Sequence, residues 1–295
     1  MSDALLECKD VIRIYETTKS KVKIPALRGI DLSIREGDLI AVIGPSGAGK
    51  TTLINLLGML DRPSSGEITL NSPTAGQVKY SEEKIKNLVN LRREVFGFLF
   101  QLPEQNLLYH LTAFQNVVFP MKVSGKYTRE ERIKRAFELM TMIGIEKRKN
   151  HKPPKMSGGE AQRLGLCIAL ANDPAIVLAD EPTGELDSMN TYSMIKYIRE
   201  LNESLGKTFV VVTHDHRFQA LTDITYRIQD GKISTLHRPK DASLDFRLRE
   251  EFAYVSDDGG IRIPDELRNR YAIGKMIRFE PAEGFIKIIP VKDED

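Results

Sequence analysis

The chain has 295 residues, of which 41% are hydrophobic and 28% are charged, and its formal net charge is +2. These values are those of an ordinary globular protein, long enough for one large domain or for a large and a small one. The charge is unevenly distributed, because residues 241–295 hold 13 acidic and nine basic side chains, a net charge of −4, and residues 1–240 carry the remaining +6. This division indicates two modules and argues against a tail that binds the phosphate backbone of a nucleic acid.

The sequence shows no feature of a secreted or membrane-spanning chain. Its first ten residues, MSDALLECKD, do not have the basic and then apolar arrangement of a signal peptide. The longest apolar runs, such as LIAVIG and AIVLA, are far shorter than the roughly 20 residues needed to cross a bilayer. Cys8 and Cys167 have no metal-ligand spacing, so we expect reduced cysteines that pack in the core of a cytosolic protein.

Alternating apolar and polar residues predict half-buried strands over residues 5–15 and 22–35. Residues 38–44 form a continuous apolar run, which is typical of a central strand that is buried on both faces. Further strands are expected at 66–70, 95–100, 174–180 and 207–215, and helices after residue 45 and at 81–94, 128–142, 157–173 and 188–206. Buried strands that alternate with helices imply an α/β sandwich with a largely parallel sheet.

The segment GPSGAGKT, Gly44–Thr51, fits the phosphate-loop pattern GxxxxGK[ST] between a predicted strand and a predicted helix. Its glycines let backbone N–H groups turn toward phosphates, and the helix start adds a partial positive charge. Lys50 can reach the β and γ phosphates and Thr51 can bind Mg²⁺. The alternative is a glycine-rich turn without a nucleotide. The residues assigned to nucleotide binding here are Gly44, Pro45, Ser46, Gly47, Ala48, Gly49, Lys50, Thr51 and Thr52.

A pair of acids follows the predicted strand AIVLA, at Asp180 and Glu181. Asp180 can hold Mg²⁺ through water, and Glu181 can orient or deprotonate the water that attacks the γ-phosphate. Strands often end in acids at a loop, so this pair gains its meaning from the phosphate loop. Together the two motifs predict hydrolysis of the nucleotide.

A second glycine pair lies at a predicted helix start, in Ser157, Gly158, Gly159 and Glu160. Ser157 and Glu160 have the spacing of a capping box, so the simplest interpretation is a well-capped helix. That interpretation does not explain the glycines, which are unfavourable in a helix and leave its N–H groups open to an anion. We therefore expect this helix start to bind the γ-phosphate of an ATP molecule that is held by another copy of the chain.

Over about residues 4–236 the sequence resembles the ATP-binding cassette ATPases, through the ordered set Gly44–Thr51, Gln101, Ser157–Glu160, Asp180–Glu181, Asp187 and His214. The resemblance implies the fold of that family, an α/β P-loop nucleotide-binding domain with a helical subdomain. It also implies that ATP closes two copies into a head-to-tail dimer, in which Ser157, Gly158 and Gly159 bind the γ-phosphate across the interface.

By this resemblance, Tyr15 would stack on adenine and His214 would contact the γ-phosphate. Gln101 would sense Mg²⁺ and the attacking water while it touches a membrane permease, and Asp187 would line the dimer interface. As alternatives, Tyr15 is an ordinary strand aromatic, Gln101 a solvated residue and His214 a structural residue at a strand end. The other histidines considered, which we expect to be structural or exposed, are His110, His151 and His216.

The resemblance implies ATP and Mg²⁺ as cofactors, the metal being held by Thr51, Gln101 and Asp180, and catalysis by Glu181, His214 and Gln101. The expected partners are a second copy and an integral membrane permease, with no nucleic acid. The chain itself is expected to be cytoplasmic and peripheral on the inner face of the cell membrane. The segments GPSGAGKTTLINLLGMLDRPSSGEI, FQNVVFPM and LADEPTGELD are most similar to the subgroup that powers lipoprotein release and macrolide export. The alternatives are a soluble, non-transporting switch ATPase and an ATP-binding scaffold with little turnover.

Residues 241–295 are expected to form a small second domain after the cassette of residues 1–240. The segment from Gly259 predicts a strand, a short helix that begins at Pro264, and two further strands around an AEG turn. This order resembles the AbrB-type swapped hairpin, although Gly260 stands where that pattern commonly has an arginine. Such a short piece would gain stability by intertwining with a second copy, so we expect dimerisation or regulation. Packing onto the cassette and contact with DNA or RNA are the alternatives.

Overall fold

The computed structural model describes residues 4–17, 21–72, 76–184, 186–239, 249–253, 261, 263, 265–274, 277–282 and 285–290. Its strands are β1 (Leu6–Glu16), β2 (Lys23–Ile34), β3 (Leu39–Ile43), β4 (Ser65–Ser72), β5 (Gly76–Lys79), β6 (Phe96–Leu99), β7 (Ile176–Asp180), β8 (Thr208–Thr213), β9 (Ile224–Gln229), β10 (Lys232–Pro239), β11 (Arg249–Ala253), β12 (Ile277–Ala282) and β13 (Phe285–Pro290).

The α-helices are α1 (Lys50–Leu57), α2 (Ile85–Val95), α3 (Pro103–Asn106), α4 (Ala113–Ser124), α5 (Arg129–Met142), α6 (Gly158–Leu170), α7 (Ser188–Leu205) and α8 (Asp265–Arg270). Short 3-10 turns occur at η1 (Glu146–Arg148), η2 (Pro153–Lys155) and η3 (His216–Ala220). Within the described part of the chain, no helix combines the length and the apolar character that a membrane span requires.

The central sheet has the strand order β11-β10-β9-β3-β8-β7-β6. The strands from β9 to β6 are parallel, whereas β10 and β11 are antiparallel additions at one edge. The five residues of β3 are all buried, and they alternate between two hydrophobic clusters on opposite faces of the sheet. The largely parallel sheet predicted from the sequence is therefore confirmed.

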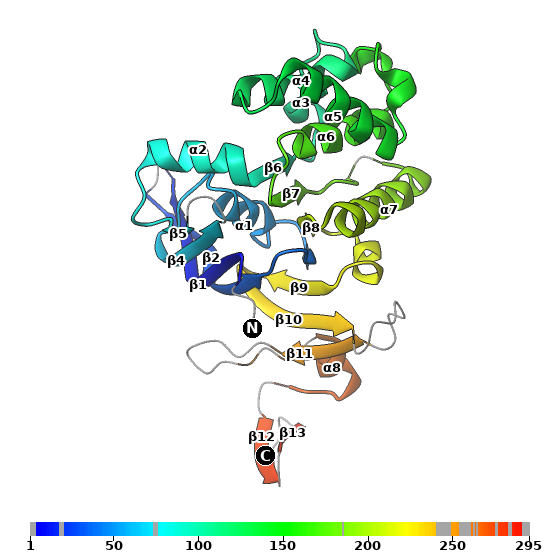
Figure 1. Cartoon of the computed structure of the whole chain (residues 1–295). Helices are drawn as coiled ribbons and strands as arrows, with labels where there is room; N and C mark the ends of the chain where they lie inside the picture. Colours follow the sequence, from blue (N-terminus) through cyan, green and yellow to red (C-terminus); the bar gives the residue numbers. More distant parts are fainter. Residues whose placement is uncertain are drawn as a thin grey trace.

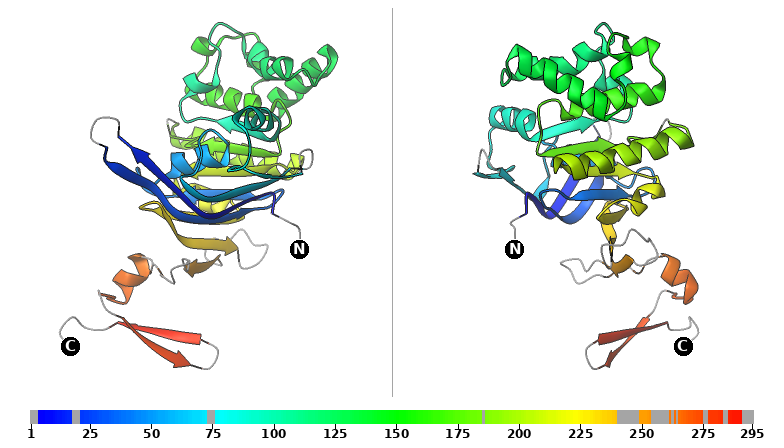
Figure 2. Two further views of the ribbon diagram at one scale, coloured as in Figure 1. Left: turned by 90° about the vertical axis from the view of Figure 1, so that its left-hand side faces the viewer. Right: turned by 45° about the vertical axis from the view of Figure 1, so that its right-hand side comes forward.

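A second, antiparallel sheet with the order β2-β1-β4-β5 lies beside the central one. Helix α1 fills the space between the two sheets, and Figures 1 and 2 show it enclosed by both. Leu53 and Leu56 of α1 are fully buried in the same cluster as Ile40 and Val42 of β3. This packing fixes the start of α1 at the end of β3, where the phosphate loop lies.

Helices α3 to α6 form a helical subdomain at one end of the molecule, and α7 lies along the remaining face of the central sheet (Figure 1). Helices α4, α5 and α6 each begin with a complete capping box, made by Thr112, Thr128 and Ser157. In such a box two backbone N–H groups at the helix start gain side-chain acceptors. The helix predicted over residues 128–142 is confirmed by α5, with Thr128 as its N-cap.

The tail includes α8 and the hairpin of β12 and β13, which extend away from the cassette in both views of Figure 2. The predicted boundary after residue 240 lies between two paired strands, because Arg238 of β10 pairs with Glu250 of β11. Pro264 and Gly260 lie outside the described residues. Cys8 and Cys167 are buried, and burial raises the pKa of both thiols, so they are packing residues as expected.

Candidate functional site

The phosphate loop turns at Gly49, which is the N-cap of α1 and has a left-handed backbone with φ of 102°. A Cβ at this position would lie 2.6 Å from the carbonyl oxygen of Ala26 in β2, so only glycine fits. No side chain caps α1. Its first N–H groups are therefore left without side-chain acceptors at the edge of the loop, which is the arrangement that binds phosphate.

Lys50 is buried inside this loop, and its ammonium group is held by three acceptors. Its Nζ donates to the carbonyl oxygens of Gly44, at 2.9 Å, and Pro45, at 3.1 Å. The same Nζ lies 3.4 Å from Oε1 of Glu181. An ammonium group has three N–H donors, so a phosphate can bind Lys50 only by replacing one of these acceptors.

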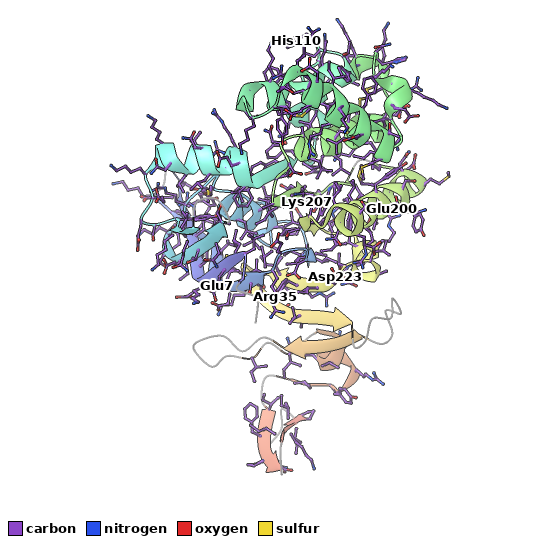
Figure 3. All side chains as sticks on the ribbon, in the orientation of Figure 1. Glu7, Arg35, His110, Glu200, Lys207 and Asp223 are labelled. Atoms are coloured by element: carbon purple, nitrogen blue, oxygen red, sulfur yellow. The ribbon has the colours of Figure 1, made fainter. Side chains whose placement is uncertain are left out.

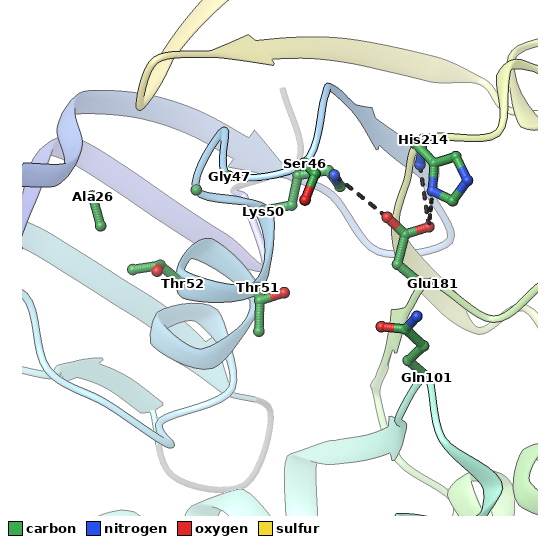
Figure 4. A pocket seen from close by; sticks show the side chains of 10 residues that line it. Ala26, Ser46, Gly47, Lys50, Thr51, Thr52, Gln101, Glu181 and His214 are labelled. Atoms are coloured by element: carbon green, nitrogen blue, oxygen red, sulfur yellow. Dashed lines mark hydrogen bonds and ion pairs between the residues drawn. The ribbon is translucent and has the colours of Figure 1, made fainter. Parts of the chain in front are cut away.

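Glu181 follows β7 and points across the pocket toward Lys50 and His214 (Figure 4). Its Oε2 accepts from the Thr213 hydroxyl at 2.9 Å and the His214 N–H at 3.2 Å, and it lies 3.0 Å from His214 Nδ1. The residue has φ of 45°. This left-handed conformation is uncommon for glutamate, and the surrounding bonds must hold it. Its own N–H supplies one of them, donating to Val212 at 2.8 Å.

Thr51 lines the pocket and lies beside Asp180, which is not among the lining residues, with 3.5 Å between Thr51 Oγ1 and Asp180 Oδ1. Burial raises the pKa of Asp180, the hydrogen bond from Thr51 opposes that rise, and the charge of Glu181 adds to it. A partly buried carboxylate beside a hydroxyl matches the oxygen ligands that Mg²⁺ prefers. No group of three or more metal-binding side chains occurs among the described residues. Few protein ligands are expected for Mg²⁺, which keeps waters and phosphate oxygens.

One cavity of about 550 Å³ joins these groups and is lined by Ala26, Ser46, Gly47, Gly49, Lys50, Thr51, Thr52, Gln101, Glu181 and His214. Gln101 enters it from the loop after β6, on the side of Glu181 away from Lys50 (Figure 4). A Cβ at Gly184 would lie 3.3 Å from the Gln101 amide nitrogen, so the segment after Glu181 contacts this glutamine closely. The cavity thus brings together predicted residues from four separate parts of the chain.

The second glycine pair forms the capped helix start that the sequence predicts. Ser157 is the N-cap of α6, and its hydroxyl accepts from the N–H of Glu160 at 3.3 Å. A Cβ at Gly158 would meet nothing within 4 Å, whereas one at Gly159 would lie 2.7 Å from Oδ1 of Asn190. Gly158 therefore faces open space, although neither the cap nor the packing requires a glycine there.

Asp187 lies close to this helix start rather than to the phosphate loop. It is the N-cap of α7, and its carboxylate accepts from the N–H of Asn190 at 2.8 Å and from the Asn190 amide at 2.9 Å. Asn190 in turn packs against Gly159. The two helix starts thus form one continuous surface, which does not line the cavity.

Tyr15 is also absent from the cavity lining. Its ring is 37% exposed, its hydroxyl donates to Asp61 at 2.8 Å, and the Arg13 guanidinium lies 4.5 Å from the ring centre. One ring face is thus covered by a cation. His110 and His216 are exposed, and Figure 3 places His110 at the outer end of the helical subdomain.

Four residues that contact the predicted groups were not predicted from the sequence: Thr213, Ala26, Asn190 and Arg148. Thr213 holds Glu181, and Ala26 lines the cavity. The Arg148 Nε donates to Glu160 at 2.7 Å. Thr213 could have been found as a hydroxyl at the end of a buried strand beside His214. The others carry no local pattern that indicates their contacts.

Comparison with known families agrees with this geometry, because residues 27–184 match the family described as ABC transporter. The chain is 38% identical over 233 residues to the lipoprotein-releasing system ATP-binding protein LolD of Francisella tularensis (strain FSC 198), covering 79% of this chain and 97% of that protein. It is 40% identical over 223 residues to LolD of Bacteroides fragilis, and this match covers 76% of this chain and 100% of that protein.

It is also 41% identical over 233 residues to the macrolide export ATP-binding/permease protein MacB of Hyphomonas neptunium, of which it covers only 34%. Among solved structures, the dimeric post-hydrolysis state of the ATP-binding cassette MJ0796 with ADP and Pi is similar, with a TM-score of 0.70 and 37% identity. That match covers 79% of this chain and 98% of the other.

Proposed function

This chain belongs to the ABC transporter family and is an ATP-hydrolysing transport subunit. From that premise we propose which residues bind ATP, which residues hydrolyse it and which proteins the chain assembles with. The observation that carries the proposal is the single cavity in which Lys50, Gln101, Glu181 and His214 meet. Each of these groups has a distinct part in phosphoryl transfer to water.

Binding of ATP begins at the phosphate loop. The phosphates lie against the N–H groups at the start of α1, and Lys50 exchanges its bond to Glu181 for a phosphate oxygen. This exchange offsets part of the negative charge of the triphosphate and leaves one Glu181 oxygen, Oε1, without its lysine. The ATP that arrives thereby prepares Glu181 to accept a proton.

Hydrolysis then requires a water in line with the bond between the β and γ phosphates. Oε1 of Glu181 orients this water and accepts its proton as the oxygen attacks phosphorus and the bond to ADP breaks. Thr213 and His214 hold Oε2, so the carboxylate keeps one orientation during the reaction. Gln101 contacts the same water from the opposite side.

We assign a Mg²⁺ site to Thr51 and Asp180, with Gln101 at its edge. Their hydroxyl, carboxylate and amide oxygens fit this ion, and Asp180 is a half-buried carboxylate beside the phosphate loop. Bound there, the ion would offset charge on the β and γ phosphates. The protein groups themselves need only fix the positions of the Thr51 and Asp180 oxygens.

The expected ATPase test compares Glu181→Gln with the wild type. Turnover should fall by about 10²–10⁴-fold, the usual size of a general-base contribution, while ATP binding is retained because the acceptor that competes for Lys50 loses its negative charge. Glu200→Gln, an exposed residue of α7, serves as the matched control and should keep full turnover. Full activity in Glu181→Gln would remove the proposed base.

We further propose that ATP pairs two copies head to tail, so that Ser157, Gly158 and Gly159 of one copy contact the γ-phosphate held by the other. Gly158 faces open space at a helix start and leaves room for close approach of an anion. Asp187 lies beside the same surface. The similar MJ0796 cassette is described as dimeric, which supports a pair of this kind.

Tyr15 keeps its proposed role as the residue on which adenine stacks, on the ring face away from Arg13.

The proposed membrane partner is a permease of the lipoprotein-release or macrolide-export kind, which would hold this chain at the cytoplasmic face of the membrane. The relatives named LolD and MacB support this subgroup. Leu102, directly after Gln101, is 39% exposed, and such an apolar residue beside the site suits a protein contact. No nucleic-acid partner is proposed.

Co-purification tests this partner. We expect a polytopic membrane protein to co-purify with the wild type and to be lost in Leu102→Asp, while the ATPase rate of the isolated subunit is unchanged. Val22→Asp, at a comparably exposed position outside the helical subdomain, should keep the partner. A soluble partner in place of the membrane protein would support the switch ATPase and reject transport.

For the tail we propose dimerisation through the hairpin of β12 and β13. Its register places six apolar side chains on one face, in the pairs Ile277–Pro290, Phe279–Ile288 and Pro281–Ile286. Phe279 is 54% exposed and Ile286 is 67% exposed. A two-stranded hairpin is at best marginal in water, so this face needs a cover, and the second copy of an AbrB-like hairpin would supply it.

The mass of the full-length chain without nucleotide tests this proposal. A dimer is expected for the wild type and a monomer for Phe279→Asp. Arg278→Asp is the matched control, because Arg278 lies on the opposite face of the hairpin beside Glu280, and it should stay dimeric. A monomeric wild type would exclude a constitutive hairpin dimer.

A further inference from the structure

Glu160 places a carboxylate at the helix start that we propose for a second copy's γ-phosphate. It belongs to the capping box of α6, in which its Oε2 accepts from the N–H of Ser157 at 2.9 Å. A helix start favours an anion through its N–H groups, but a full negative charge within the first turn repels a second anion there. The cap therefore opposes phosphate binding unless another group offsets the charge of Glu160.

Arg148 is that group. Its Nε donates to the remaining carboxylate oxygen, Oε1, at 2.7 Å, so each oxygen of Glu160 has one donor. Burial would raise the pKa of Glu160, but the bonds from Ser157 and Arg148 and the Arg148 charge outweigh it and hold that pKa below its usual value. Glu160 is therefore ionised at neutral pH, and its charge has to be balanced whenever ATP is present.

The backbone that carries Arg148 is fixed to the helical subdomain. Arg148 ends the turn η1, and its carbonyl accepts from the N–H of His151 at 2.8 Å. The next carbonyls along this segment accept from the start of α4, where Phe114 donates to Lys149 at 3.0 Å and Ala113 donates to His151 at 2.8 Å. These backbone hydrogen bonds fix the position from which the Arg148 side chain extends. That side chain is 44% exposed, and the side chain of Glu160 is 16% exposed.

We propose that Arg148 is a positioning residue, which neutralises and orients Glu160 so that the start of α6 can accept the γ-phosphate of ATP bound to a second copy. This inference rests on the proposed composite site. It makes a prediction that a purely structural salt bridge does not make. If loss of Arg148 weakens ATP binding because the Glu160 carboxylate is left unpaired, replacing that carboxylate must restore ATP binding. Glutamine suits this purpose, because it completes a capping box as well as glutamate does.

The experiment measures the KM for ATP and kcat of the full-length chain in a double-mutant cycle. Arg148→Ala should raise KM by about tenfold with a smaller change in kcat, as expected when ATP binding meets one uncompensated charge. The double variant Arg148→Ala/Glu160→Gln should return KM to within about twofold of the wild-type value, as should Glu160→Gln alone. Lys134→Ala, in the exposed pair with Glu138 on α5, is the matched control and should leave KM unchanged.

Two outcomes would overturn the inference. An unchanged KM in Arg148→Ala would show that the charge of Glu160 is harmless, and an equal rise in both backgrounds would show that Arg148 only supports the fold. Gly158→Ala shows whether such a result reflects failure of this inference alone or failure of the proposed composite site. If Gly158→Ala also leaves KM and kcat unchanged, the helix start takes no part in ATP binding, and both the proposed dimer site and this inference fail.

Discussion

At the scale of single residues, the orientation of Glu181 depends on a side chain that touches no phosphate. The Thr213 hydroxyl donates to Glu181 Oε2 and accepts from the N–H of Asp215 at 3.0 Å, and Thr213 is fully buried. Thr213→Val removes this donor at nearly constant volume. We expect kcat to fall by about tenfold, roughly the worth of one hydrogen bond to a charged group, with KM for ATP unchanged.

Thr213→Ser is the matched variant for this prediction, because it restores the hydroxyl without the methyl group. It should recover most of the lost kcat. A loss of kcat that Thr213→Ser does not recover would trace the effect to packing of β8 instead of the orientation of Glu181.

The sequence predicts the residues of the cavity well where a motif fixes their backbone positions. Lys50 and Thr51 follow from the loop pattern, and Glu181 from its place after a buried strand. Thr213 was missed because a threonine in a run of valines is ordinary for a strand. The left-handed backbone of Glu181 could not be predicted either, since it arises from contacts with β8 rather than from the glutamate itself.

At the scale of elements, a substitution at the start of α6 tests whether this segment is only a capped helix or also binds an anion. Gly158→Ala keeps the capping box, meets no neighbouring atom and replaces a poor helix former by a good one. We expect an unfolding midpoint that is unchanged or slightly higher, together with a loss of ATP hydrolysis of about tenfold or more. Thermal unfolding and steady-state turnover on the same sample test this. Retained turnover would leave only the capped helix.

A second element-scale prediction concerns Asp173, which joins α5 of the helical subdomain to the segment before β8 of the central sheet. Its Oδ1 lies 2.9 Å from Arg135 of α5 and 3.3 Å from Lys207 before β8. Burial raises the pKa of Asp173, but the charges and hydrogen bonds of Lys207 and Arg135 outweigh it and hold the pKa below 3.8. A depressed pKa gives stability that is present above the usual value and is lost as pH falls through the lowered one.

Asp173→Asn should therefore lower the free energy of unfolding at pH 7 by about 0.5–1 kcal/mol, a small value because Asp173 is half exposed. The difference from the wild type should shrink as pH falls below 3.8. Asparagine tolerates the left-handed backbone of this position, φ 58°, so the charge is the main change. Urea unfolding at several pH values measures it, with Glu200→Gln, an exposed residue of α7, as the control. A loss that persists unchanged in acid would contradict the charge argument.

The elements themselves follow from the sequence where periodicity is strong. The strands at 38–44, 174–180 and 207–215 and the capped helix at 128–142 are confirmed by β3, β7, β8 and α5. Helix α4 was not predicted, because it is apolar on several faces and contains Pro120 in its interior. Strand β11 was not assigned to the cassette, because its place in the sheet depends on pairing with β10 and not on a local pattern.

At the scale of the whole molecule, the proposed ATP site requires two copies of the chain. One chain holds the phosphate loop, Glu181 and His214 in one cavity, whereas Ser157 and Gly158 line a separate surface beside Asp187. The distance between these halves of the site cannot be predicted from one sequence, since it is set by how two chains meet. The tail acts at the same scale, because an exposed apolar hairpin face would keep two copies close before ATP binds.

The most direct test of this account is the mass in solution of Glu181→Gln/Phe279→Asp, measured by light scattering with and without ATP. Phe279→Asp disables the proposed hairpin dimer, and Glu181→Gln prevents hydrolysis, so any pairing reports the ATP-bound cassettes alone. We predict a monomer without nucleotide and a dimer with ATP, and a monomer in both conditions when Gly158→Ala is added. A monomer at saturating ATP before that addition would contradict the shared ATP site and leave Ser157–Glu160 as a helix cap.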